Sequence, residues 1–276
     1  MTRTKGSIHP SAVIDPGAEL DSSVHVGPYS IIGSHVRIGK ETWIGPHVVL
    51  DGYTTIGTQN RIFQFASVGA IPQDKKYRDE ESALLIGDQN VIREFTTLNP
   101  GTAGGGMVTR IGDGNLFMAY SHVAHDCQIG NGVVLANCAT LGGHVVLENY
   151  VGVGGLVGVH QFTRIGESAY LGAGSMVSLD VPPYCTAVGD RAHLHGLNLV
   201  GLKRRGWTNE QITLLKRSYR ILFSEGLPLK EALTAVRETA ANAPAILHLA
   251  NFIAASTRGI CRPRGNEDPE GEEELV

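Results

Sequence analysis

An apolar residue recurs at every sixth position of this chain, and that period constrains the fold more than any other feature. Glycine often follows it directly, and a small or β-branched residue usually stands two positions before it. A period of six fits neither an amphipathic helix, which repeats about every 3.6 residues, nor a lone strand, which alternates about every two. It is typical of a hexapeptide-repeat β-helix, in which three short strands form one coil of about 18 residues. The first uninterrupted run is Ile8, Ile14, Leu20, Val26, Ile32, Ile38, Ile44, Leu50, Ile56, Ile62 and Val68.

Two segments interrupt the repeat. Residues 71–84 (IPQDKKYRDEESAL) are charged and poor in strand formers, so we expect an extruded loop, although the 18 residues from Val68 to Ile86 would fit an ordinary coil. Such a loop is either functional or a solvated excursion. Residues 99–110 (NPGTAGGGMVTR) shift the frame by one residue. Their glycine cluster at 104–106 lacks the Lys-Ser/Thr of a phosphate-binding loop, and we interpret it as a flexible corner.

The composition changes after Pro182 and Pro183. Thr208 and Gln211 form a capping-box pattern, and residues 211–223, 229–240 and 245–256 have helical spacing. We therefore predict a mainly β fold: a left-handed parallel β-helix over 1–190, then a small α-helical domain over 191–264. The acidic tail, 265–276, is predicted to be disordered.

Composition excludes several classes of protein. A net charge of −4 gives no reason to expect nucleic acid as a partner. No run of 18 apolar residues is present, so we expect no membrane span, and the polar start predicts a cytoplasmic rather than a secreted protein. Cysteines at 127, 138, 185 and 261 have no close-pair spacing, which indicates thiols in a reducing compartment.

Histidines of the central repeats are the candidates for chemistry. His125 and His144 are 19 positions apart, which is close to one coil, and His160 follows after 16 more. Asp126 directly follows His125, and a carboxylate beside an imidazole can orient a general base. The backbone N–H groups before His144, at Gly142 and Gly143, suit an oxyanion. Isolated histidines of this kind are otherwise structural corner residues, and three imidazoles together can also hold zinc.

Several motifs resemble those of the UDP-N-acetylglucosamine O-acyltransferase family, which acts first in lipid A biosynthesis. The resemblance covers residues 9–258. It is carried by SHVAHDC at 121–127, LGGH at 141–144, VHQF at 159–162, DVPPY at 180–184 and GLKRRG at 201–206, with QFASVG at 64–69, QDKKY at 73–77 and STRG at 256–259.

This resemblance implies a homotrimer with active sites between subunits. It implies transfer of a 3-hydroxyacyl chain from acyl carrier protein to the 3-hydroxyl of UDP-N-acetylglucosamine, with no cofactor beyond the carrier's phosphopantetheine and no metal. It implies His125 as general base, Asp126 as its orienting partner and the Gly143 N–H as oxyanion donor. The implied substrate-binding residues are Asp74, Lys76, His122, His144, His160, Gln161, Asn198, Arg204 and Arg205.

Three positions depart from the family's pattern. Val200 replaces a common Glu and Arg191 a common His, and both changes bear on nucleotide binding. Ala173 stands where a Gly lets the acyl chain pass, so we expect Ala173 to act as a chain-length ruler and to favour slightly shorter chains. A basic cluster at the start of the helical region is expected to dock the acidic carrier, unless it is only a solvated helix face. That cluster is Lys203, Arg204, Arg205, Lys216, Arg217 and Arg220.

Two other functions remain open from the residues alone. The histidines can belong to a metal-dependent hydratase like the carbonic-anhydrase-like hexapeptide proteins. The chain can also be a non-catalytic scaffold that binds a nucleotide sugar. Stoichiometric zinc would favour the former, and sugar binding without turnover the latter.

Overall fold

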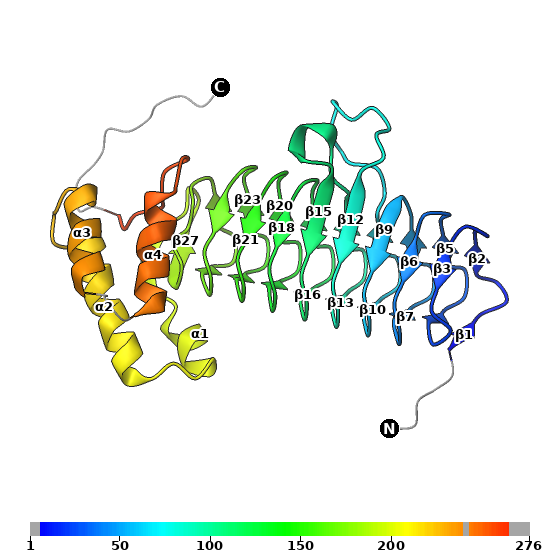
Figure 1. Ribbon diagram of the computed structural model, residues 1–276, viewed down its shortest axis with the longest axis horizontal. Helices are drawn as coiled ribbons and strands as arrows, with labels where there is room; N and C mark the ends of the chain where they lie inside the picture. The colour runs from blue at the N-terminus through cyan, green and yellow to red at the C-terminus, as the bar shows by residue number, and fades with distance from the viewer. Residues whose placement is uncertain (1–5, 240–242, 265–276) are drawn as a thin grey trace.

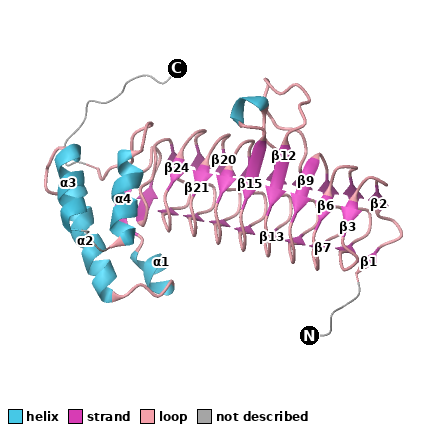
Figure 2. Cartoon of the chain, viewed as in Figure 1, coloured by secondary structure: helices cyan, strands magenta, loops and turns pink. Residues whose placement is uncertain are grey.

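The computed structural model describes residues 6–239 and 243–264, and the predicted acidic tail lies outside the described residues. The chain forms a long three-sided column of stacked coils with a group of helices at its C-terminal end (Figure 1). Each coil contributes one short strand to each of three parallel sheets, called A, B and C here (Figure 2). The six-residue period thus produces the parallel β-helix that it predicts.

Sheet A has 11 strands and sheets B and C have 9 and 8. Sheet A contains β1 (Ser7–Ile8), β4 (His25–Val26), β7 (Trp43–Ile44), β10 (Arg61–Ile62), β13 (Val91–Ile92), β16 (Leu116–Phe117), β19 (Val134–Leu135), β22 (Gly152–Val153), β25 (Tyr170–Leu171), β27 (Cys185–Val188) and β28 (His193–Leu197). Sheet B contains β2 (Val13–Ile14), β5 (Ile31–Ile32), β8 (Val49–Leu50), β11 (Ser67–Val68), β14 (Thr97–Leu98), β17 (His122–Val123), β20 (Thr140–Leu141), β23 (Gly158–Val159) and β26 (Met176–Val177). Sheet C contains β3 (Glu19–Leu20), β6 (Arg37–Ile38), β9 (Tyr53–Ile56), β12 (Ala83–Ile86), β15 (Val108–Ile111), β18 (Gln128–Ile129), β21 (Val146–Leu147) and β24 (Arg164–Ile165).

The second residue of each two-residue strand points into the column, and the first points out. From β4 onward this inward residue is buried in every such strand, for example Leu50, Ile92 and Leu135. The core consists of these inward apolar side chains, each stacked on its neighbours in the adjacent coils. Burial of each large side chain stabilises the fold by roughly 1.5–3 kcal/mol. The period therefore sets both the winding of the chain and its stability.

Two coils are longer than 18 residues, and both insertions leave the column at the corner between sheets B and C. Ile56 pairs with Ile86, 30 positions away, so the chain between β11 and β12 holds two hexads more than a regular coil. Ile86 pairs with Ile111, 25 positions away. The first insertion covers residues 69–82, and the second, residues 99–107, contains a 3₁₀ helix, Ala103–Gly105. Figure 1 shows the two loops rising side by side.

The C-terminal region starts with a hairpin rather than a helix. Antiparallel pairing of β27 with β28 places residues 193–197 in sheet A, although they fall in the range expected to be helical. Four helices follow: α1 (Leu199–Arg204), α2 (Asn209–Phe223), α3 (Leu229–Thr239) and α4 (Pro244–Ala254). The capping box predicted at Thr208 and Gln211 is confirmed, and α2, α3 and α4 occupy the three segments with helical spacing.

Helix α4 is joined to the last coils by a charged contact. The Nε2 atom of His248 lies 2.7 Å from Glu148 Oε2, and that oxygen also accepts the Glu167 N–H. The Glu148 hydrogen bond raises the pKa of His248, more than burial lowers it. Burial would raise the pKa of Glu148, but the His248 and Glu167 hydrogen bonds outweigh it and the pKa is lowered. The pair thus favours its ionised form.

None of the helices within the described residues is long and apolar enough to cross a membrane.

Candidate active site

The corner between sheets B and C, called the B–C corner, gathers the predicted reactive side chains. His125 and Asp126 follow β17, and His144 follows β20 one coil later. Asp126 and His144 both turn the corner with φ of 61°, the left-handed region. This repeated turn stacks the residues of successive coils, so the His125 and His144 rings meet edge to face with centroids 5.1 Å apart. The His144 ring in turn stacks on Phe162, at 4.2 Å.

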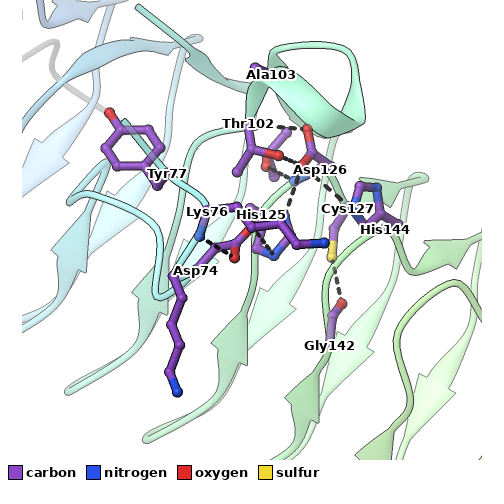
Figure 3. Close-up of polar contacts among 12 residues, drawn as sticks. Asp74, Lys76, Tyr77, Thr102, Ala103, His125, Asp126, Cys127, Gly142 and His144 are labelled. Carbon is purple, nitrogen blue, oxygen red and sulfur yellow. Dashed lines mark hydrogen bonds and ion pairs between the residues drawn. The ribbon is translucent and has the colours of Figure 1, made fainter. Parts of the chain in front are cut away.

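Asp126 is a buried carboxylate held by the loop over residues 99–107. Its Oδ2 accepts hydrogen bonds from Thr102 Oγ1 at 2.6 Å and from His125 Nδ1 at 2.8 Å, and its Oδ1 accepts the Thr102 N–H at 3.0 Å. Gly105 lies so close that a Cβ there would be 1.9 Å from Asp126 Cγ. The 3₁₀ helix therefore packs directly on this carboxylate, as Figure 3 shows.

His125 is oriented by a hydrogen bond at one of its two ring nitrogens. Because the Asp126 carboxylate can only accept, Nδ1 donates to it and Nε2 is left as the basic nitrogen. Asp74 Oδ2, on the 69–82 loop, lies 4.0 Å from Nε2. The ring lies against Gly143, where a Cβ would be 2.6 Å from Cε1. An unprotonated Nε2 in this arrangement can remove a proton from a hydroxyl nucleophile.

Glu80 joins the two loops through one hydrogen bond and stabilises its own loop through another. Glu80 Oε1, on the 69–82 loop, accepts the Ala103 N–H at 2.9 Å, and Glu80 Oε2 accepts the Arg78 N–H. The N–H bond from Ala103 is the largest cause of a lowered Glu80 pKa. On the same loop the Lys76 N–H donates to Asp74 Oδ1 at 2.9 Å, which fixes the turn that carries Asp74.

A cavity of about 780 Å³ opens beside His125 along the outer face of sheet B. Its lining includes His122, Gly143, His160, Gln161 and Arg191. Burial is the main cause of lowered pKa values for His122 and His144, so both rings favour the neutral form. Of these two rings, His122 lines the cavity, so the cavity presents a neutral imidazole and backbone groups beside His125. Gly143 N–H donates to no protein acceptor within the residues that the structure describes.

Three predicted substrate-binding residues lie away from the His125 cavity in the structure. Asn198 caps α1 by accepting the Gly201 N–H, and it donates to Ser168 O at 2.9 Å. Arg205 packs over the Tyr150 ring and donates to Ser168 Oγ. Ser168 and Tyr150 lie on the corner between sheets C and A, so Asn198 and Arg205, with Arg204 on the same helix, are not brought to the His125 cavity of their own chain.

Ala173 occupies a third position. It follows β25 on the corner between sheets A and B, called the A–B corner, and it is exposed there. Gly154 lies close to it, because a Cβ on that glycine would be 2.6 Å from Ala173 N. It lies at the opposite edge of sheet B from His125. A chain that starts at His125 and reaches Ala173 would have to cross the outer face of sheet B.

A metal ion is the other ligand that these residues could hold. His125, Asp126 and His144 each offer one ligand atom, and these atoms lie within 4.8 Å of one another. The fit is incomplete, because Asp126 Oδ2 already accepts two hydrogen bonds and His125 Nδ1 is one of the two donors. A metal bound there would have to replace that bond.

No role in the site was predicted from the sequence for Thr102 or Arg258, and Gly105 was misinterpreted. Thr102 was given no role, and Gly105 belongs to the glycine cluster interpreted as a flexible corner, yet both pack against Asp126. Arg258 was noted only as part of a motif, and its Nη2 lies 2.7 Å from His160 Nδ1. The one-residue shift of frame at 99–110 was the available signal, because an insertion at one corner must lie over that corner.

The fold and this site together are those of a hexapeptide-repeat transferase, with a histidine–aspartate pair on one corner of a β-helix. Comparison with known proteins gives the family. A hexapeptide transferase profile (six repeats) matches residues 109–143, and a profile of UDP N-acetylglucosamine O-acyltransferase, domain 2, matches residues 180–261. The chain belongs to the UDP-N-acetylglucosamine O-acyltransferase family, as its motifs indicate.

Relatives and solved structures agree. The chain is 60% identical over 260 residues to the acyl-[acyl-carrier-protein]–UDP-N-acetylglucosamine O-acyltransferase of Paracidovorax citrulli, a match that covers 93% of this chain and 99% of that protein. The Myxococcus xanthus protein of the same name is 54% identical, with 92% and 99% covered. The structure of LpxA from Acinetobacter baumannii superimposes with a TM-score of 0.90 at 42% identity, covering 92% and 99% of the two chains.

Proposed function

We propose that this acyltransferase moves a 3-hydroxyacyl chain from acyl carrier protein to the 3-hydroxyl of UDP-N-acetylglucosamine, the first step of lipid A biosynthesis. The observation that carries the proposal is the His125–Asp126 pair, with Nδ1 2.8 Å from the carboxylate and Nε2 beside an open cavity. The relatives' names supply the donor and the acceptor sugar. No cofactor beyond the donor's phosphopantetheine is proposed.

The chemistry follows from these positions. His125 Nε2 takes the proton of the sugar hydroxyl while that oxygen attacks the thioester carbonyl carbon. The Gly143 N–H stabilises the resulting oxyanion as a preformed hydrogen-bond donor. When the intermediate collapses, the C–S bond breaks and the phosphopantetheine thiolate takes the proton back from His125. Asp126 stabilises the transient imidazolium.

We also propose that the site is completed by a second subunit in a homotrimer. Asn198, Arg204 and Arg205 lie on the corner between sheets C and A, away from the cavity on sheet B. A three-fold axis beside the A–B corner would set sheet B of one subunit against sheet A of the next. The neighbour's Asn198 and two arginines would then stand on the cavity side, where guanidinium groups suit a diphosphate.

The A–B corner has the surface that such an axis requires. It carries a ladder of stacked rings, with Phe65 and Phe95 48% and 43% exposed and their centroids 5.0 Å apart. Exposed apolar columns of this kind mark association surfaces. The ladder comprises Tyr29, His47, Phe65, Phe95 and Tyr120. Phe65→Glu combined with Phe95→Glu should convert trimer to monomer by light scattering, and unchanged mass would contradict this packing.

The donor's contacts are proposed from charge and position. The exposed cations of the basic cluster, such as Arg217, suit an acidic carrier protein. Ala173, at the far edge of sheet B, would limit the acyl chain. A ladder of hydroxyacyl donors tests this limit, and preference for the longest chain would count against it. A cytoplasmic site of action agrees with four free cysteines.

The test of the function is turnover by His125→Ala. Loss of a general base should lower kcat by roughly 10²-fold or more, with the product identified by mass spectrometry. The assay should contain mixed acyl donors and both the 3-hydroxyl and the 3-amino acceptor sugars, so that it shows whether oxygen or nitrogen accepts the acyl chain. Sugar binding without any turnover by the wild-type protein would support a scaffold instead.

A metal-dependent hydratase is the alternative function, because three ligand atoms at the B–C corner are close enough to hold one metal ion. Elemental analysis of the purified protein decides it. Stoichiometric zinc, together with loss of activity on chelation, would favour a metal-dependent hydratase.

A further inference from the structure

The segment after α4 returns to the cavity and delivers Arg258 to it. Residues 260 and 263 form bridges to Asp180 and Leu194, and Ser256 Oγ donates to Asp180 Oδ2 at 2.8 Å. The segment is therefore fixed on the last coil. From there Arg258 reaches back: Nε donates to Ser178 O at 2.5 Å, and Nη2 lies 2.7 Å from His160 Nδ1. Both Ser178 and His160 line the cavity beside His125.

The contact with Arg258 determines which nitrogen of the neutral His160 ring carries the proton. A guanidinium group has only donors and keeps its proton at any physiological pH. His160 Nδ1 must therefore accept, so it carries no proton, and the neutral ring carries its proton on Nε2. Among the described residues no hydrogen bond is made to His160 Nε2. An N–H donor is thus left for an acceptor atom that the protein does not supply.

A competing partner makes Arg258 necessary for this state. The Gln161 carbonyl oxygen lies 3.0 Å from the same Nδ1 atom, and it can only accept. Without the guanidinium, Nδ1–H would donate to Gln161 O, and Nε2 would become an acceptor. The ring would keep its place but present the opposite polarity to the cavity.

We propose that Arg258 is a positioning residue that holds His160 as a neutral Nε2–H donor toward a substrate oxygen. The oxygen is a hydroxyl, carbonyl or phosphate oxygen of the bound acceptor or donor. This inference rests on the proposed function for its substrate, but the tautomer itself is a property of the free protein. The two can therefore be tested separately.

The tautomer is measured by ¹⁵N–¹H correlation of the histidine rings, at a pH where the ring is neutral, with His160→Ala to assign its signals. In the wild type, Nε2 should be the protonated nitrogen. In Arg258→Met, the proton should move to Nδ1. Arg262→Met is the matched control, because Arg262 lies on the same segment and is exposed. An Nδ1-protonated wild-type ring, or a ring that Arg258→Met leaves unchanged, would overturn the proposal.

Kinetics test the consequence with acyl carrier protein donor and UDP-N-acetylglucosamine. Arg258→Met should lower kcat/KM by about 10- to 100-fold, the effect of one misdirected hydrogen bond. In a His160→Ala background the same change should have little further effect, because Arg258 acts through that ring. Additive losses in the double variant, together with a lowered Tm in Arg258→Met alone, would show a merely structural arginine. A wild type without turnover would refute the proposed function and leave the tautomer result standing.

Discussion

The close fit between His125 and Gly143 gives the sharpest prediction. In Gly143→Ala the new methyl group would lie 2.6 Å from His125 Cε1 and 2.7 Å from Nε2. Ordinary carbon contacts are about 3.5–4.0 Å, so the ring must move by about 1 Å. Gly143 does not have a left-handed φ, so alanine is not strained there, and its N–H is retained. The substitution therefore displaces the base without removing the oxyanion donor.

The size of the effect follows from that displacement. A reacting group misplaced by about 1 Å can cost about 10²-fold in rate, or about 2.7 kcal/mol in the barrier. The ring cannot shift without lengthening the 2.8 Å bond to Asp126, which also orients it. We expect kcat of Gly143→Ala to fall about 100-fold.

Steady-state assays with acyl donor and nucleotide sugar measure this loss. Gly155→Ala is the matched control, because it is the second glycine of another Gly-Gly corner and its Cβ would lie 3.4 Å from the nearest atom, an ordinary contact. Circular dichroism should show both variants folded. Full activity in Gly143→Ala would refute the assignment of His125 as a precisely placed base.

Three further predictions concern the loop, the core and the helical region. Thr102→Val removes a donor to Asp126, and kcat should fall about tenfold. Asn90→Ala breaks a buried amide ladder, and urea unfolding should show a loss of about 2 kcal/mol. The His248–Glu148 pair stabilises most between the two groups' ordinary pKa values, 4.5 and 6.5. Because the pKa of His248 is raised, the contribution of His248 to the free energy of unfolding is complete below pH 6.5. That contribution disappears as the pH rises through the raised pKa. Thermal unfolding should show this decline, which His248→Gln should abolish.

Much of the fold follows from local patterns. The inward residue of each strand is encoded every six positions, so the winding and the core can be predicted without distant contacts. The confirmed capping box at Thr208 shows the same for α2, because a helix start is a local arrangement of donors and acceptors. The pairing of His125 with Asp126 is also local, since the two residues are adjacent.

The remaining part of the site depends on which coil lies over which. Ile56 pairs with Ile86 across 30 residues, and because the excess is two whole hexads, the six-residue frame stays in register and does not reveal the insertion. The contacts of Thr102 and Gly105 with Asp126 arise because an inserted loop folds over its own corner, and Arg258 reaches His160 from 98 residues away. The amino-acid sequence determined the column and the His125–Asp126 pair, because both are encoded locally. Only the tertiary structure decided what surrounds that pair, because those contacts join segments that no local period relates.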